Sequence, residues 1–245
     1  MCLIVFAWQV VPGAPLIAAA NRDEFYDRPA AAAGAWPEHP KVYAGRDLKG
    51  GGSWMGITQE GMYGARFAAL TNIRGPQERR EEAPSRGALV ADFLAGELSA
   101  EDYIGKIAKG SVAYNGFNLV LGDRKRLFWF SNRGDDDERN GKALAPGIYG
   151  ISNSLLDAPW PKVVRTKAQF ASLLCQGAPE DAYFEMLADT TRAPDLRLPD
   201  TGIALDLERV LSAVCIETAG YGTRTSTVVK LWDDAPAELH ERVLQ

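Results

Sequence analysis

Two apolar runs near the start of the chain constrain its fold most, because the turn between them makes them a hairpin. Residues 3–8 and 16–20 are apolar, and the sequence Val-Pro-Gly-Ala between them is typical of a tight turn. We therefore predict two antiparallel strands here. Such a hairpin would return Arg22 and Asp23, which follow the second strand, to the side of Cys2.

The later segments predict further groups of strands and helices. Residues 26–50 are rich in Pro, Gly and Ala and are expected to form a loop with short extended pieces. In order, we expect strands at 53–58 and 66–73, helices at 86–95 and 100–108, strands at 117–121, 127–131 and 147–152, helices at 162–174 and 182–187, and strands at 210–217 and 225–232.

This order of elements decides the fold class. Strands, helices, strands, helices and strands in succession indicate an α+β fold and argue against a doubly wound sheet. Two sheets and two pairs of helices pack naturally as a four-layer αββα sandwich. We expect residues 1–245 to form a single domain of this kind.

The composition excludes several classes of protein. The chain has 245 residues, 46% of them hydrophobic, and a net charge of −5, which argues against nucleic acid as a partner. No stretch approaches the roughly 20 apolar residues of a membrane span. Three cysteines without a CxxC pattern indicate a reducing compartment, so we expect a cytoplasmic location. His39 and His240 are the only histidines, and we expect no metal site.

Cys2 is the first candidate catalytic residue. If an aminopeptidase removes Met1, Cys2 carries a thiol and a free α-amine, whose reference pKa values are about 8.5 and about 7.7–8.0. The amine can then take the thiol proton near neutral pH, directly or through a water. The alternative is a small buried apolar residue, which is the ordinary state of a cysteine. Cys175 and Cys215 fit that alternative.

Charged and amide residues at predicted strand ends are candidates for the rest of a site. Asp23 can accept a hydrogen bond from a protonated amine, and Arg22 can hold a thiolate or a substrate carbonyl; the alternative is a surface ion pair. Asn72 and Asn153 can each donate to an oxyanion, or serve only as turn residues. Arg224 can bind a substrate carboxylate or tune the thiol, or be solvated.

Three glycines at 50–52 precede Ser53 and Trp54. No Lys-Ser or Lys-Thr pair follows at the spacing of a phosphate-binding loop. We expect a loop whose glycines let the backbone approach a pocket or a neighbouring strand, with Trp54 in the core or in the pocket wall.

Taken together, these segments resemble the NRDE family, also called the transport and Golgi organisation family. The matching pieces run in order from residue 1 to about residue 230, and Ser53 stands where the family pattern has Thr. They are Met1-Cys2, Asn21-Arg22-Asp23-Glu24, Gly51-Gly52-Ser53-Trp54-Met55-Gly56, Leu70-Thr71-Asn72-Ile73-Arg74, Tyr114-Asn115-Gly116-Phe117-Asn118, Gly150-Ile151-Ser152-Asn153, Pro159-Trp160-Pro161-Lys162 and Tyr221-Gly222-Thr223-Arg224-Thr225-Ser226.

The NRDE family is in turn distantly similar to cysteine N-terminal-nucleophile (Ntn) amidases, which cleave a C–N amide bond through an acyl-thioester. That similarity implies the αββα sandwich, with Cys2 as nucleophile and Arg22 and Asp23 holding and orienting it. It implies Asn153 as an oxyanion donor or amine partner and Arg224 as the group that completes the site. The residues then expected to contact a small acylated substrate are Asn21, Asn72 and Trp54.

A second function from another class stays open at this point. The family resemblance also implies haem trafficking and lipid or acyl-CoA metabolism, so the chain is alternatively a carrier that binds haem or another hydrophobic metabolite. Trp8, Trp36 and Trp54 would line its pocket, and Cys2 or His39 would be the axial ligand of the haem iron. No other cofactor is expected, and the sequence does not indicate an oligomeric state.

Overall fold

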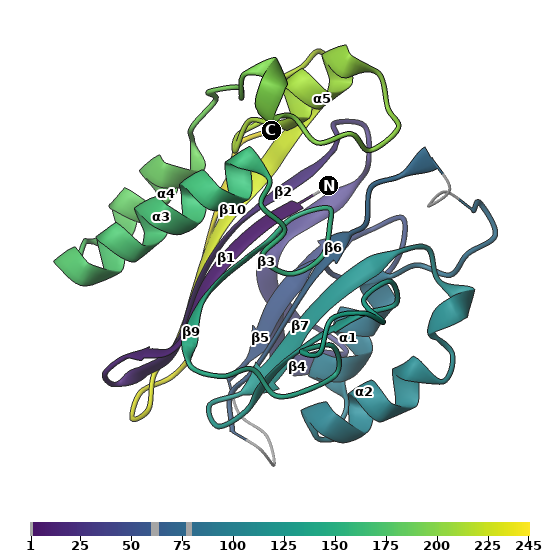
Figure 1. The fold of residues 1–245 in the computed structure, drawn as a ribbon. Helices are drawn as coiled ribbons and strands as arrows, with labels where there is room; N and C mark the ends of the chain where they lie inside the picture. The colour runs from purple at the N-terminus through teal and green to yellow at the C-terminus, as the bar shows by residue number, and fades with distance from the viewer. Residues whose placement is uncertain (1, 60–63, 77–79) are drawn as a thin grey trace.

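The computed structural model describes residues 2–59, 64–76 and 80–245, and these form four layers (Figure 1). Two antiparallel sheets face each other across a shared apolar core. Helices cover the outer face of each sheet. The predicted α+β class and the αββα sandwich are therefore confirmed.

The first sheet carries the chain start. Among the described residues it has five strands in the order β11-β10-β2-β1-β9. Each strand runs antiparallel to its neighbours, and β1 and β2 form the predicted hairpin at the centre of the sheet. The strands are β1 (Cys2–Val11), β2 (Ala14–Phe25), β9 (Gly147–Ile151), β10 (Tyr221–Leu231) and β11 (Glu238–Val243).

The second sheet has the order β3-β4-β5-β6-β7-β8 within the described part of the chain. The loop expected over residues 26–50 is wrong for most of that stretch, because β3 and β4 occupy it. An Ala- and Gly-rich segment has weak strand propensity, and here it forms the edge of the sheet, where β4 holds it. A turn between the strands expected at 53–58 and 66–73, which the sequence predicts at residues 60–61, lies outside the described residues. The strands are β3 (Ala30–Trp36), β4 (His39–Asp47), β5 (Met55–Thr58), β6 (Arg66–Asn72), β7 (Phe117–Asp123) and β8 (Leu127–Ser131).

The helices form the two outer layers. Helices α1 and α2 pack on the second sheet, whereas α3 and α4 pack on the first (Figure 1). The strand expected at 210–217 is wrong, because α5 occupies 205–211 and the residues after it form no ladder of a sheet. No helix of the described residues is long and apolar enough to cross a membrane. The helices are α1 (Gly87–Ala95), α2 (Ala100–Ala108), α3 (Pro161–Gln176), α4 (Glu180–Leu187) and α5 (Leu205–Leu211), with short 3-10 turns η2 (Ser111–Ala113) and η3 (Asp195–Arg197).

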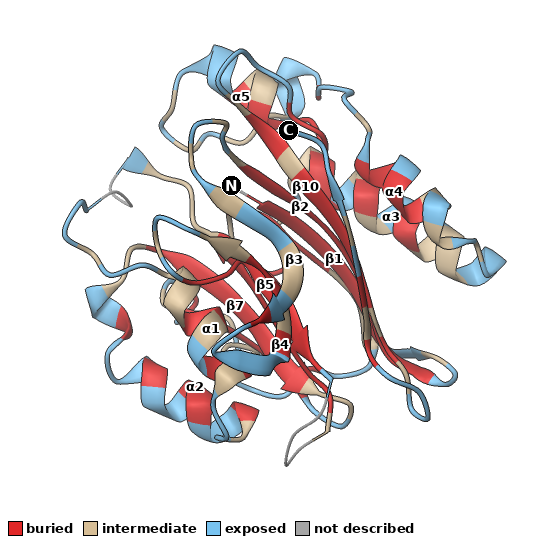
Figure 2. Cartoon of the chain, turned by 180° about the vertical axis from the view of Figure 1, so that it is seen from behind, coloured by how far each residue is buried: buried red, intermediate tan, exposed pale blue. Residues whose placement is uncertain are grey.

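Alternation along the central strands distributes their side chains between two apolar layers. Ile4 and Phe6 of β1 lie in the core between the sheets, whereas Leu3 and Val5 pack under α3 and α4. Figure 2 shows the result, with buried residues filling the central strands and exposed ones on the edge strand β3 and on the outer sides of the helices. Burying one such side chain stabilises the fold by roughly 1.5–3 kcal/mol. This face assignment also decides which polar residues can approach Cys2.

One side of the sandwich is closed by a carboxylate. Glu241 on β11 accepts a hydrogen bond from the backbone N–H of Ala33 on β3, at 2.8 Å. The two residues belong to different sheets, and each lies on an edge strand. Burial raises the pKa of Glu241 above its usual range. The edge of the second sheet is thus tied to the edge of the first.

Candidate active site

The register of the first hairpin places Cys2 beside Arg22. The two residues are direct cross-strand partners of β1 and β2, so their side chains lie on the same face of the sheet. That face is the one directed at the second sheet, because Ile4 and Phe6, at alternate positions after Cys2, lie in the core between the sheets. Cys2 is 9% exposed. The predicted juxtaposition of Cys2 with Arg22 is thus present in the structure.

A cavity of about 540 Å³ opens at this end of the sandwich. Cys2, Arg22 and Asp23 line it from the first sheet, and Trp54 and Asn72 line it from the second. Its remaining described wall is largely polar and charged. Those wall residues are Glu24, Arg28, Asp47, Lys49, Ser53, Leu70, Arg80, Glu81, Ala83, Pro84, Ser85, Arg86, Gly87 and Asn115.

The guanidinium of Arg22 makes a cation–π contact with the ring of Trp54. The guanidinium lies 4.2 Å from the ring centroid, and Arg22 is 5% exposed. Such a contact fixes a desolvated guanidinium. Arg22 Nη1 is buried and has no hydrogen-bond partner among the described residues. Gly45 makes room for the ring, since a Cβ there would lie 2.2 Å from Trp54 Cζ2. The stacked guanidinium thus keeps one N–H group, at Nη1, that no described residue uses.

Asp23 follows Arg22 on β2 and lines the cavity together with Cys2. Thr223 Oγ1 donates a hydrogen bond of 2.7 Å to Asp23 Oδ1. The Asp23 backbone N–H donates to the Cys2 sulfur. Burial raises the pKa of Asp23, and the positive charge of Lys162 opposes that rise. A buried carboxylate therefore lies near the thiol of the candidate nucleophile.

The thiol of Cys2 is not acidic in this setting. Burial raises its pKa, the Asp23 carboxylate raises it further, and the Arg22 guanidinium lowers it. The net direction is upward, so the sulfur holds its proton near neutral pH. Nucleophilic chemistry at this sulfur would need a base nearby.

Two asparagines tie strand ends together beside Cys2. Asn153, just after β9, is fully buried and donates from Nδ2 to the backbone oxygen of Asn72 at 2.9 Å. Its neighbour Ser152 donates from Oγ to the backbone oxygen of Cys2 at 2.9 Å. Asn72 ends β6 and lines the cavity, while Asn153 lies behind it. Amide N–H groups therefore gather where β1, β6 and β9 meet.

Besides Asn153, two more of the predicted residues do not line the cavity. Asn21 points to the helix side of the sheet, where its Nδ2 donates to the backbone oxygens of Leu187 and Val214 at 2.8 and 2.9 Å. Its Oδ1 accepts from Ser226 Oγ at 2.7 Å, so the carboxamide is fully used in holding the fold. Arg224 sits in a bulge of β10 and donates to backbone oxygens of the 25–28 segment. Neither residue lines the cavity described above.

The residues proposed for a carrier are dispersed. Trp8 lies in the core between the sheets, and Trp36 packs between the second sheet and its helices, so only Trp54 of the three lines the cavity. His39 begins β4 and is exposed. It does not line the cavity around Cys2. The expectation of an aromatic pocket built from all three tryptophans is therefore wrong.

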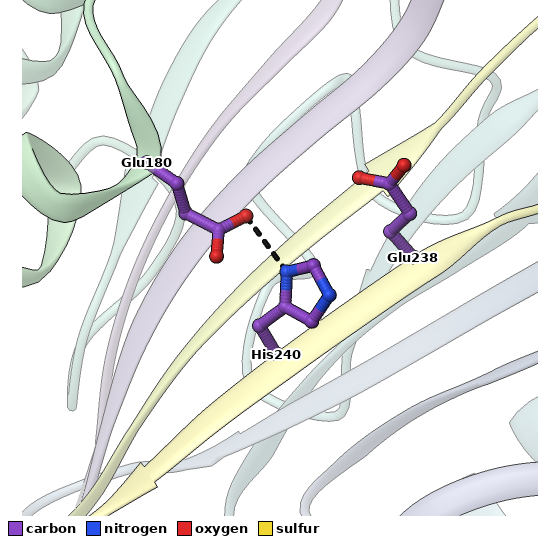
Figure 3. A group of neighbouring side chains, drawn as sticks. All are labelled: Glu180, Glu238 and His240. Carbon is purple, nitrogen blue, oxygen red and sulfur yellow. Dashed lines mark hydrogen bonds and ion pairs between the residues drawn. The ribbon is translucent and has the colours of Figure 1, made fainter.

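A group with potential metal ligands lies elsewhere, between α4 and β11. Ligand atoms of Glu180, Glu238 and His240 lie within 4.8 Å of one another (Figure 3). His240 Nδ1 is 2.8 Å from Glu180 Oε2, and Lys230 Nζ is 3.2 Å from the same oxygen. The carboxylate of Glu180 already faces an ammonium group, and we assign no metal to these residues.

Sequence reasoning missed three buried charges beside the site. Lys162 in the first turn of α3 is 1% exposed, and burial lowers its pKa to about 8. Arg74 pairs with Glu208 at 2.7 Å, and both side chains are almost inaccessible. One signal was available: a basic residue in the first turn of a helix opposes the helix dipole, which favours acidic residues there.

Two facing antiparallel sheets between helix layers, with a cysteine at the start of a central strand, define the Ntn-hydrolase fold. The solved structure of a Caenorhabditis elegans N-acylethanolamine-hydrolyzing acid amidase ortholog matches with a TM-score of 0.50 over 100% of both chains. The identity is 10%, so this likeness concerns the fold alone.

The chain belongs to the Transport and Golgi organisation 2 family, whose sequence model matches residues 1–245. It is 38% identical to the Transport and Golgi organization protein 2 homolog of Bos taurus, over 99% of this chain and 92% of that protein. The homolog of Homo sapiens is 35% identical over the same shares. The Drosophila melanogaster protein is 31% identical, over 98% of this chain and 90% of its own length. The resemblance seen in the sequence is confirmed.

Proposed function

We propose that this protein is a cysteine amidohydrolase that cleaves a C–N amide bond of a small acylated amine, with Cys2 as nucleophile after removal of Met1. One observation carries the proposal. Cys2 is the first residue of a central strand, is paired with Arg22, and borders a cavity with polar walls. A structural cysteine would need none of these neighbours.

The proposed reaction has two halves. The α-amine of Cys2 takes the thiol proton as Sγ attacks the carbonyl carbon, whose π electrons move onto the oxygen. The C–N bond then breaks, the departing nitrogen takes the proton from the amine, and the acyl group remains on Sγ as a thioester. Water next attacks the thioester and gives a proton to the amine. The C–S bond breaks, the acid is released, and the proton returns to sulfur.

Neighbouring groups support each step. Asp23 lines the cavity together with Cys2 and would hold the ammonium form of the amine. Arg22 and Asn72 also line the cavity and would donate to the carbonyl oxygen as it becomes charged. Asn153 would act through Asn72, whose backbone oxygen accepts its hydrogen bond. Preorganised donors of this kind contribute several kcal/mol to acyl transfer, about 2.7–4 for a single donor. The raised pKa of the thiol explains why a base on the same residue is needed.

The charged wall of the cavity favours hydrolysis over carriage of haem or another apolar metabolite. A carrier for such a ligand would need mostly apolar walls. Here Arg28 and Asp47 form an ion pair of 2.7 Å within the wall, and Glu24 and Lys49 add further charge. We propose a polar or charged acylated amine as substrate. The three free cysteines also support a cytoplasmic location.

The test begins with the chain terminus. We expect the intact mass of natively purified protein to lack Met1, and a chloroacetamide probe to modify Cys2 at a rate that differs from that of exposed Cys175. A panel of acylated amines should give an acyl-enzyme adduct in the wild type and in Cys175→Ala, but not in Cys2→Ala. A retained Met1 would refute the amine as base.

A haemin titration distinguishes the alternative function, a haem carrier, from the proposed hydrolase. If the wild type shifts the haemin spectrum, Cys2→Ala does not, and no acylated amine is turned over, then the carrier function is correct and the hydrolase proposal is wrong. An unchanged haemin spectrum with both proteins would exclude specific binding of haem through the Cys2 thiol.

A further inference from the structure

Lys162 occupies a position that is unfavourable for a lysine. It is the second residue of α3, it is 1% exposed, and its Nζ has no hydrogen-bond partner among the described residues. Burying an unpartnered ammonium costs several kcal/mol, and the positive end of the helix dipole adds to that cost. A methionine of similar shape would avoid both penalties. The position therefore suggests a role for the charge itself.

The charges that face Lys162 come from four elements. They are Cys2 on β1, Asp23 on β2, Arg74 just after β6 and Glu208 on α5. The carboxylate of Glu208 is already engaged, since it pairs with Arg74 at 2.7 Å and accepts hydrogen bonds from Thr201. The other carboxylate that faces Lys162 is that of Asp23.

Asp23 in turn depends on Lys162. It is 1% exposed, and burial raises its pKa. Thr223 donates one hydrogen bond to it, and the phenol of Tyr221 and the Arg74 guanidinium also border it. Among the described groups, the positive charge that most strongly opposes its protonation is that of Lys162. Without this charge a buried carboxyl would take up a proton at a higher pH.

We propose that Lys162 is a positioning residue whose positive charge keeps Asp23 ionised, and that Asp23 can hold the α-ammonium group of Cys2 only in that form. The inference rests on the proposed function for its catalytic consequence. The link between Lys162 and Asp23 stands on the burial and the facing charges of the two side chains.

The direct test measures the ionisation of Asp23. In protein labelled with carbon-13 at the aspartate carboxyl, the Asp23 signal is identified by its loss in Asp23→Asn, and its shift is followed with pH. We expect the midpoint to rise by about one pH unit or more in Lys162→Met, as for loss of an opposite charge nearby. Lys162→Arg should restore the wild-type midpoint.

Lys167→Met is the matched control, because Lys167 lies on the same helix but pairs with Asp157 at 2.7 Å and is part-exposed. It should leave the Asp23 midpoint unchanged. If Lys162→Met also leaves it unchanged, the proposal is wrong. The acid limb of kcat/KM should move with the Asp23 midpoint in Lys162→Met. A moved midpoint without any amide turnover would keep the Lys162–Asp23 link and overturn the proposed function.

Discussion

The buried Lys162 gives the protein a pH-dependent stability that can be worked out from its surroundings. Burial lowers the pKa of Lys162 from 10.5 to about 8 in the folded state. Between these values the unfolded chain binds a proton that the folded protein does not, so the free energy of unfolding rises with pH in this window. A difference of two to three pH units, at about 1.4 kcal/mol each, amounts to roughly 3 kcal/mol over the whole window.

The measurement compares wild type with Lys162→Met. Urea unfolding at pH 7 and pH 10 gives the free energy of unfolding of each protein, and groups whose pKa values are the same in both proteins cancel in the difference. Between these two pH values the loss of the Lys162 titration alone should make the wild type gain roughly 2 to 3 kcal/mol relative to the variant, because the window is only partly covered. Lys167→Met removes a part-exposed ion pair and should change little, by about 0–1 kcal/mol, at either pH.

Two results would refute this reasoning. A difference between wild type and Lys162→Met that stays flat from pH 7 to pH 10 would mean that Lys162 is not charged and buried at neutral pH. A difference that falls with pH would mean that Lys162 gains a partner in the folded state, because a raised pKa gives stability that is lost as pH increases.

Three further substitutions test other parts of the site. Glu208→Gln breaks the buried pair with Arg74 and should lower the free energy of unfolding by about 3–5 kcal/mol in a urea titration. Gly45→Ala pushes a methyl group into Trp54 and should cost about 1–3 kcal/mol and slow modification of Cys2 by a thiol reagent. Asn21→Ala leaves two buried carbonyl oxygens without donors and should cost about 1–3 kcal/mol, with the rate of Cys2 modification at pH 7 unchanged.

Each of these has an outcome that contradicts it. A Glu208→Gln protein as stable as wild type would show that the pair contributes nothing to stability. If Cys2 in Gly45→Ala reacted with the thiol reagent as fast as in the wild type, the contact between Trp54 and Arg22 would have no influence on the reactivity of Cys2. A stable Asn21→Ala protein that loses substrate binding would restore Asn21 to the site, as the sequence suggested.

The sequence was sufficient to predict a helix or strand wherever the local sequence pattern and the tertiary packing favour the same structure. The β1–β2 hairpin and α2 carry their own signals, a Pro-Gly turn in one and Ser99 accepting from the backbone N–H of Asp102 in the other. The strand expected at 210–217 failed, because an apolar run shows that a segment is buried and not that it joins a sheet. Here α5 ends at Leu211, and the apolar residues 213–216 are buried in irregular structure outside the two sheets.

In the site, the hairpin was predictable from the sequence. Which side chains reach the cavity, however, depends on the face of the strand from which each one projects. Arg22 and Asn21 are neighbours in sequence, yet one faces the second sheet and the other faces the helices. Arg224 was placed beside them by motif, but a bulge between Thr223 and Thr225 redirects its side chain, and no residue type announces such a bulge. Lys162 escaped notice because a lysine is ordinarily solvated.

The contact between Glu241 and Ala33 has a consequence for how copies of this protein meet in a crowded solution. An edge strand offers free N–H and C=O groups on which a foreign strand can assemble. Here an acidic side chain from the opposite sheet already occupies the N–H of Ala33. Replacing Glu241 with alanine would uncover that site, and slow self-association visible by light scattering is the behaviour to look for.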